Sequence, residues 1–174
     1  MSDTQKLCIF QLGELAFGVE VKHVQEVIRF QPMTRVPLAS GLVRGLLNLR
    51  GQIVTVLDVR ARLGLRALPD AAEPMNVVLR TPDGVVGLLV DQIGDVLELE
   101  RAAFERTPET LPAFLRDIVQ GVYKLDAMLL LLLDVERVVI LEEDGTAGRR
   151  AGAPRRPAAT AFPDAPPGAI AEPG

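Results

Sequence analysis

The chain has 174 residues, a formal net charge of −4 at pH 7, one cysteine and one histidine. A lone cysteine excludes an intramolecular disulfide, and the acidic balance lacks the clustered basic footprint of a nucleic-acid-binding protein. The sequence shows no cluster of ligand residues for a metal site. Its length is that of one domain, or of one compact body made of two small lobes.

The sequence shows neither a secretory signal nor a membrane-spanning helix. Residues 1–6 lack the charged and apolar regions of a signal peptide. The longest strongly apolar run, residues 127–133, is too short to cross a bilayer as a helix. We therefore expect a cytoplasmic protein.

The first predicted element is a β-hairpin. Leu7–Leu12 is an apolar run of strand length, and Gly13-Glu14 interrupts it. Over Phe17–Val21 apolar residues then alternate with other residues. A period of two is typical of a half-buried strand, so the two runs and the turn between them predict a hairpin.

A second β-rich segment lies further along the chain, at Gln52–Leu57. Asp58 follows it and can cap a short helix, Val59–Leu63, which Gly64 ends. The expected order is therefore a strand, an aspartate cap and a short helix.

An internal repeat organises the rest of the chain. When the sequence is aligned with itself, the segment 17–27 matches 86–96, and the segment 45–59 matches 121–135. The offset is larger for the second match because the second copy has a longer middle loop, residues 105–117. Two related units, about 1–67 and 75–141, therefore follow one another.

Each unit offers about five short strands with glycines at bends, so we expect a mainly all-β fold. The prediction is two tandem, small, five-stranded barrels packed together as one domain over residues 1–144, with a few short helices. Exchange of strands between the two lobes is compatible with the repeat. A groove is expected where the lobes meet.

The C-terminal segment, residues 145–174, differs in composition from the rest. Twenty of its residues are Ala, Gly or Pro, and four are arginines. Such a segment buries too little apolar surface to offset its ordering entropy. We predict that residues 145–174 form a disordered tail.

A search for catalytic groups yields only weak candidates. There is no P-loop and no nucleophile elbow, and the only serines are Ser2 and Ser40. His23 with Cys8 is one candidate pair, against which a surface histidine at a strand end is favoured. Asp58 and Asp134, at equivalent places in the two units, form another. Helix capping is the favoured role for both aspartates.

The segment 17–64 resembles the CheW family. The motifs that carry the resemblance are Val24-Gln25-Glu26-Val27, Asn48-Leu49-Arg50-Gly51 and Leu57-Asp58-Val59-Arg60, in the family's order and at its spacing. The second half agrees through Val86–Asp91, Asp95–Leu97 and Leu132–Val135. The resemblance covers about residues 6–141. Each motif is weak alone, and together they are specific.

The resemblance implies two Src-homology-3-like five-stranded barrels, no catalytic activity and no cofactor. CheW-like proteins bind the regulatory domain of a CheA-type histidine kinase and the cytoplasmic tip of methyl-accepting chemoreceptors. We therefore expect a chemotaxis adaptor of a two-component pathway, recruited to membrane-associated receptor arrays. It would have no nucleic-acid partner and no direct membrane insertion. An apolar groove between the lobes would receive a helical receptor hairpin.

The same resemblance points to individual residues. Receptor contact is expected of Arg50, Asn48 and Val24, and kinase contact of Glu26 and Ile53. Each has a structural alternative: Arg50 pairing with a nearby carboxylate, Asn48 bracing its loop, Val24 and Ile53 lying in the core, and Glu26 being a solvated charge.

Further residues have expected roles outside direct contact. The glycines Gly45, Gly51 and Gly87 are expected to serve backbone geometry near the interfaces. The arginines Arg60, Arg62 and Arg66 are candidates for steering an acidic partner, with a solvated face as the default.

Two other functions compete with a stand-alone adaptor. One is a CheW-like module of another assembly, as a kinase regulatory domain or a receiver-linked scaffold. The chain is too short for a receiver or a kinase core, which favours the adaptor. The other is a small-ligand-binding barrel, which would need a concave polar site that the sequence does not show.

Overall fold

The computed structural model describes residues 3–37, 39, 41–69, 72–143 and 146–150. The strands are β1 (Thr4–Leu12), β2 (Leu15–Glu20), β3 (Val24–Arg29), β4 (Val43–Leu49), β5 (Gln52–Asp58), β6 (Met75–Thr81), β7 (Gly84–Val90), β8 (Gln92–Glu100), β9 (Phe104–Glu105), β10 (Val119–Lys124), β11 (Leu129–Leu133), β12 (Ile140–Glu143) and β13 (Thr146–Arg150). The helices are η1 (Val21–His23), α1 (Val59–Arg62), η2 (Arg101–Ala103), α2 (Ala113–Arg116) and α3 (Val135–Val138).

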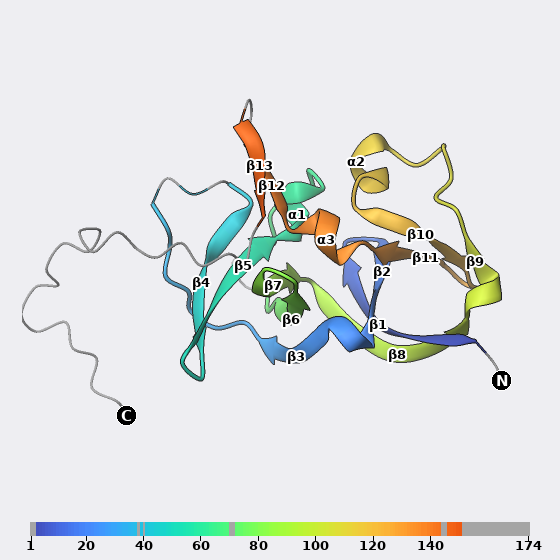
Figure 1. Ribbon diagram of the computed structural model, residues 1–174, viewed down its shortest axis with the longest axis horizontal. Coiled ribbons are helices and arrows are strands. Elements are labelled where there is room, and N and C mark those ends of the chain that lie inside the picture. The colour runs from blue at the N-terminus through green and yellow to red at the C-terminus, as the bar shows by residue number, and fades with distance from the viewer. Residues whose placement is uncertain (1–2, 38, 40, 70–71, 144–145, 151–174) are drawn as a thin grey trace, which may run out of the picture.

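Two sheets make up the body of the protein. Sheet 1 has the order β3-β6-β7-β5-β4, and sheet 2 has the order β8-β1-β2-β11-β10-β9. In Figure 1 sheet 1 occupies the left of the molecule and sheet 2 the right, with α1 and α3 near the boundary between them. The predicted all-β fold with short helices is therefore confirmed.

The two sheets do not coincide with the two sequence units. The hairpin β1–β2 belongs to the first unit and pairs with β8 and β11 of the second, while β6–β7 pairs with β3 and β5 of the first. The sequence units at about 1–67 and 75–141 are therefore not the two barrels themselves: each barrel takes its hairpin from the other unit, which is the strand exchange that the repeat allowed.

The internal repeat is nevertheless a real structural repeat. In the parallel pair β2–β11, Phe17 lies opposite Leu131, and in the parallel pair β5–β7, Val86 lies opposite Thr55. These two pairs occupy equivalent positions in the two units, because Phe17 corresponds to Val86 and Thr55 to Leu131 in the alignment of the units. Bulges also correspond, since both β4 and β10 are irregular near their first residues, at equivalent positions.

Both sheets close on themselves through the chain that leaves their edge strands. After β8 the chain turns through η2 into β9, where Glu105 pairs with Val122 of β10. After β3 the chain returns at Thr34, whose N–H donates to the carbonyl of Leu46 in β4 at 2.9 Å. Each closure joins the two ends of one sheet, which gives a small barrel.

The interior is filled by apolar side chains. The largest cluster contains residues of both sheets, including the stacked rings of Phe10 and Phe17, whose centroids lie 5.6 Å apart. Each barrel has a smaller cluster of its own, around Leu130 in sheet 2 and around Val54 in sheet 1. The joint between the lobes, where a groove was expected from the sequence, is therefore packed with side chains.

Two segments differ from expectation. Residues 146–150 form β13 and pair with β12, so the chain is not unstructured from residue 145 on; the rest of the predicted tail, residues 151–174, lies outside the described residues. The middle loop 105–117 contains the short helix α2, whose Leu115 is buried in the largest cluster.

A buried amide interrupts the core of sheet 1. Asn76 in β6 has no exposed surface, and neither its Nδ2 nor its Oδ1 has a hydrogen-bond partner. The equivalent position in the hairpin of the first unit is Leu7, which is also fully buried. An unsatisfied buried amide costs free energy that an apolar side chain would not.

The Asn76→Leu variant should therefore be more stable. We expect its free energy of unfolding to rise by about 1–3 kcal/mol, measured by chemical denaturation. The reciprocal variant Leu7→Asn should lose at least ~3 kcal/mol, because it buries an amide and removes apolar contacts. A destabilised Asn76→Leu protein would show that the amide is needed at this position.

Candidate partner-binding surface

The hairpin β4–β5 presents Arg50 at its tip. Leu49 pairs with Gln52, so Arg50 and Gly51 form a two-residue turn, and both have positive φ, +52° and +85°. This is the signature of a type I′ turn, which matches the twist of the strands it joins. The side-chain oxygen of Asn48 accepts a hydrogen bond from the Gly51 N–H at 2.9 Å. Asn48 thus braces the turn that displays Arg50.

Arg50 forms an ion pair with Glu26 of β3. The arginine side chain is 74% exposed and the glutamate 23%. Since β3 and β4 are the two edge strands of sheet 1, the pair spans the point where that barrel closes. The structure brings together two residues that were expected to serve different partners, and the arginine has the carboxylate partner that was its structural alternative.

Ile53 and Val24 lie at different depths. Ile53 is 60% exposed and pairs across the hairpin with Asn48, so the two side chains share a face of the sheet. The alternative that Ile53 points inward is therefore wrong. Val24 is partly buried and packs against the largest core cluster, which agrees with its structural alternative.

Of the predicted structural glycines, Gly45 has the tightest surroundings. A Cβ at Gly45 would lie 2.8 Å from the carbonyl oxygen of Thr34, on the strand segment that closes the barrel. A Cβ at Gly87 would lie 3.1 Å from Val56. Gly51 has open space around it and is required by its positive φ instead.

The two candidate aspartates have structural roles. Asp58 accepts a hydrogen bond from the N–H of Ala61, and Asp134 accepts one from the N–H of Arg137, each at 3.1 Å. Both side chains therefore cap the N-termini of short helices, as predicted.

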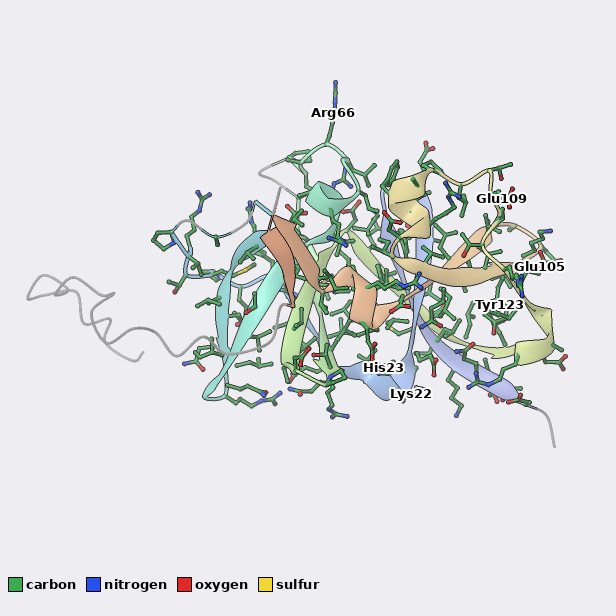
Figure 2. All side chains as sticks on the ribbon, turned by 45° about the horizontal axis from the view of Figure 1, so that its top comes forward. Lys22, His23, Arg66, Glu105, Glu109 and Tyr123 are labelled. Atoms are coloured by element: carbon green, nitrogen blue, oxygen red, sulfur yellow. The ribbon has the colours of Figure 1, made fainter. Side chains whose placement is uncertain are left out.

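The candidate pair of His23 and Cys8 offers no activated nucleophile. Cys8 is buried, and burial raises the pKa of its thiol, which opposes formation of a nucleophilic thiolate. His23 lies with Lys22 in η1 at the rim of the molecule (Figure 2). The histidine is thus at the end of a strand, as the favoured alternative had it.

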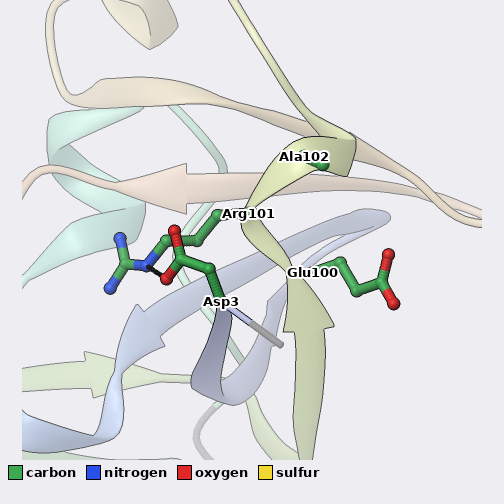
Figure 3. Close-up of a pocket in the computed structure, with 4 residues that line it drawn as sticks. All are labelled: Asp3, Glu100, Arg101 and Ala102. Carbon is green, nitrogen blue, oxygen red and sulfur yellow. Dashed lines mark ion pairs between the residues drawn. The ribbon is translucent and has the colours of Figure 1, made fainter. Parts of the chain in front are cut away.

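The described residues contain no group of His, Cys, Asp and Glu side chains placed to hold a metal ion. A hollow of about 460 Å³ is lined by Asp3, Glu100, Arg101 and Ala102 (Figure 3). Asp3 and Arg101 form an ion pair of 3.0 Å there, and their side chains are 80% and 47% exposed. The hollow is therefore an open depression at one end of sheet 2.

Some exposed apolar residues were not anticipated as surface groups. Val96 of β8, Phe114 of α2 and Leu129 of β11 are all exposed on sheet 2 or its helix. Their apolar character alone does not distinguish them from core residues, and the folded structure shows that they lie at the surface.

Comparison with known proteins places this geometry in a family. The family model described as "CheW-like domain" matches residues 6–143. The chemotaxis protein CheW of Rhizobium meliloti is 31% identical over 139 residues, which is 80% of this chain and 90% of the relative. The chemotaxis protein CheW of Klebsiella aerogenes is 30% identical over 139 residues, 80% of this chain and 84% of the relative.

A solved structure shares the fold. The crystal structure of the scaffolding protein TtCheW from Thermoanaerobacter tengcongensis superposes with a TM-score of 0.73 at 22% sequence identity. The match covers 86% of this chain and all of that one. Within the described part of this chain, no helix has the length and apolar character needed to cross a membrane.

The close approach at Gly45 yields a testable consequence. In Gly45→Ala, the new methyl group would press on the Thr34 backbone, and we expect a loss of about 1–3 kcal/mol in the free energy of unfolding. Hydrogen exchange at the Leu46 amide, which donates to the Thr34 carbonyl, should accelerate with it. Gly94→Ala is the matched control, because its Cβ would meet Ile9 at an ordinary 3.5 Å. Equal losses in the two variants would contradict the steric explanation.

Proposed function

The chain belongs to the CheW-like family, and on that premise we propose that it is a chemotaxis adaptor that couples chemoreceptors to a CheA-type histidine kinase. Relatives at 30–31% identity carry the name chemotaxis protein CheW. We propose that the protein works in the cytoplasm and is recruited there to membrane-associated receptor arrays. It acts by binding proteins and carries out no catalysis.

The single observation that carries the proposal is the family match over residues 6–143. The distribution of side chains supports it. Within the described part of the chain, both barrel interiors and the joint between them are filled mainly by apolar side chains, and the barrel interiors do not form a ligand site of the usual kind. Charged and apolar groups that can contact partners lie on the outer faces instead.

We propose that receptor contact involves Arg50, Asn48 and Val24, and that kinase contact involves Glu26 and Ile53. The arginine is the strongest of these because its guanidinium is exposed on a turn that is fixed by Asn48. A planar guanidinium on a rigid turn can donate several hydrogen bonds with little loss of side-chain entropy. Val24 would act by supporting the surface from beneath, since it is partly buried.

The ion pair between Arg50 and Glu26 joins the two proposed surfaces. An exposed pair of this kind contributes only ~0–1 kcal/mol to stability. A partner that offers Arg50 a better acceptor can therefore separate the pair at small cost and leave Glu26 available. Contact on one surface would then change the charge presented on the other.

The test uses purified protein, its cognate CheA-type kinase and receptor-containing membranes, with kinase autophosphorylation as the readout. We expect the wild-type protein to make kinase activity depend on receptors, and Arg50→Glu to reduce that dependence at least ~10-fold, because it places like charges together at the contact. Arg44→Glu is the control, since it makes the same charge change at an exposed position of the strand that leads to the turn.

The reversed pair Arg50→Glu/Glu26→Arg separates the two possible causes. It should keep normal stability and still fail in coupling if the guanidinium contacts the receptor. Recovery of coupling in the reversed pair would assign the role to the ion pair itself and overturn the receptor contact. If wild-type protein neither alters kinase activity nor binds the kinase, the adaptor function is wrong.

A further inference from the structure

The arginines in and after α1, candidates for steering a partner, divide into two groups. Arg66 projects away from the body of the protein (Figure 2). Arg60 points inward: its Nε donates to the carbonyl of Arg66 at 2.6 Å, and its Nη1 lies 2.5 Å from Oδ2 of Asp91. The side chains of Arg60 and Asp91 are each only 15% exposed. This arginine is therefore part of the internal structure.

Asp91 lies where the chain passes from sheet 1 to sheet 2, between β7 and β8. Its N–H donates to the carbonyl of Gln11 in sheet 2 at 3.0 Å. Its Oδ2 accepts a second hydrogen bond, from the N–H of Gly13 in the β1–β2 turn, at 2.7 Å. One carboxylate oxygen thus binds α1, which follows sheet 1, and a turn of sheet 2.

Arg62, the last residue of α1, forms hydrogen bonds with the chain at the end of α3. Its Nη1 donates to the carbonyl of Ile140 at 2.9 Å and its Nη2 to that of Arg137 at 3.3 Å. These carbonyls lie at and just beyond the end of α3, and that of Arg137 also accepts a hydrogen bond from the N–H of Val139. Helix α1 is therefore tied to the parts of the chain that follow or belong to sheet 2 at two places.

The internal repeat provides a second crossing, from β2 to β3, with which to compare the first. In the alignment of the two units, Asp91 corresponds to Lys22, Gly13 to Pro82, and Arg60 to Glu136. Each replacement removes one part of the arrangement. Proline has no N–H to donate, and the charges of the other two positions are reversed.

The structure at the second crossing reflects this change. Lys22 is 64% exposed and pairs at 2.7 Å with Glu20 of the strand just before it, while Glu136 is exposed on α3. The chain makes the crossing as the single 3-10 turn η1, in which no residue is buried. Figure 2 shows Lys22 and His23 at the edge of the molecule, away from its packed centre.

We propose that Asp91, Arg60 and the Gly13 amide form a clamp on one side of the joint between the two barrels, and that the barrels move relative to each other about the unclamped crossing at Val21–His23. Asp91 and Arg60 are positioning residues: they fix the angle between two surfaces that lie on different barrels. Any partner that touches both barrels binds according to that angle. This last consequence rests on the proposed adaptor function, whereas the clamp itself does not.

The clamp is suited to this role because its ion pair is largely shielded from water. Removing Arg60 leaves the Asp91 carboxylate without its cation in a place where solvent compensates poorly. Oδ1 of Asp91 is already buried without a hydrogen-bond partner, so without Arg60 the carboxylate would keep the hydrogen bond from the Gly13 N–H but have no cation. The two barrels would then be held by the Arg62 hydrogen bonds and by the shared apolar cluster, which resists separation but has little directional preference.

The first experiment measures amide hydrogen exchange by NMR in the full chain without partners. In Arg60→Met, exchange at the amides of Gly13 and Asp91 should accelerate at least ~10-fold, as expected for a local opening, while core amides such as that of Leu131 keep the wild-type rate. Glu136→Met is the matched control at the equivalent position and should leave all of these rates unchanged. Uniform acceleration of every amide, or none at Gly13 and Asp91, would overturn the clamp.

The second experiment measures the angle directly. Spin labels on Arg44→Cys in sheet 1 and Asp95→Cys in sheet 2, in a Cys8→Ala background, report the distance between the barrels by double electron–electron resonance. The distance distribution should broaden in Arg60→Met and narrow when the clamp is built at the second crossing with Lys22→Asp/Pro82→Gly/Glu136→Arg. Distributions that match the wild type in Arg60→Met would disprove control of the angle.

Asp91→Asn provides a second test in case the Arg60 variant fails to fold. It preserves shape and the acceptor for Gly13 but removes the charge, and it should broaden the distance distribution to a smaller extent than Arg60→Met. An unchanged distribution in a folded Asp91→Asn protein would also overturn the proposal. Because no kinase or receptor is present in these measurements, their failure is distinguishable from failure of the adaptor function.

Discussion

The exchange of hairpins between the two repeat units is the constraint on which the rest of the structure depends. The parallel pairs β2–β11 and β5–β7 each join one unit to the other, and each lies in the middle of a sheet. Neither barrel can therefore form from one unit alone. The chain must cross between the barrels at Val21–His23 and again at Asp91. Those crossings, together with the shared apolar cluster, decide how the outer faces of the barrels stand relative to one another.

Duplicate structure with different side chains explains how one fold can present distinct surfaces. The hairpin tips β4–β5 and β10–β11 are equivalent in the repeat, and Arg50 corresponds to Asp126 and Asn48 to Lys124. The two hairpins share one backbone requirement, because a neighbouring strand segment approaches closely at both Gly45 and Gly121. Packing therefore places the same demand on the inner positions of both copies, while the side chains at the two tips differ in charge.

Local signals predicted the local structure well. The Gly13-Glu14 turn, the Asp58 and Asp134 caps and the strand at Gln52–Leu57 each depend on a few neighbouring residues, and all are present. The partner of each hairpin could not be predicted, because parallel pairing between distant segments leaves no mark on spacing or periodicity. The same holds for the pairing of Arg60 with Asp91, which lie far apart in the chain, and for the exposure of Ile53, which depends on what covers its strand.

Two arginine–carboxylate pairs in this protein have the same chemistry and opposite consequences, and solvent exposure accounts for the difference. The Arg50–Glu26 pair lies in water on the arginine side, so separating it costs ~0–1 kcal/mol, well within what a partner's contacts can supply. For a shielded pair such as Arg60–Asp91, loss of one member costs several-fold more, about 3–5 kcal/mol when burial is complete. A partner can therefore rearrange the first pair but not the second. The pair at the hairpin tip is thus suited to the partner contact proposed for Arg50, and the pair at the crossing is suited to the proposed clamp.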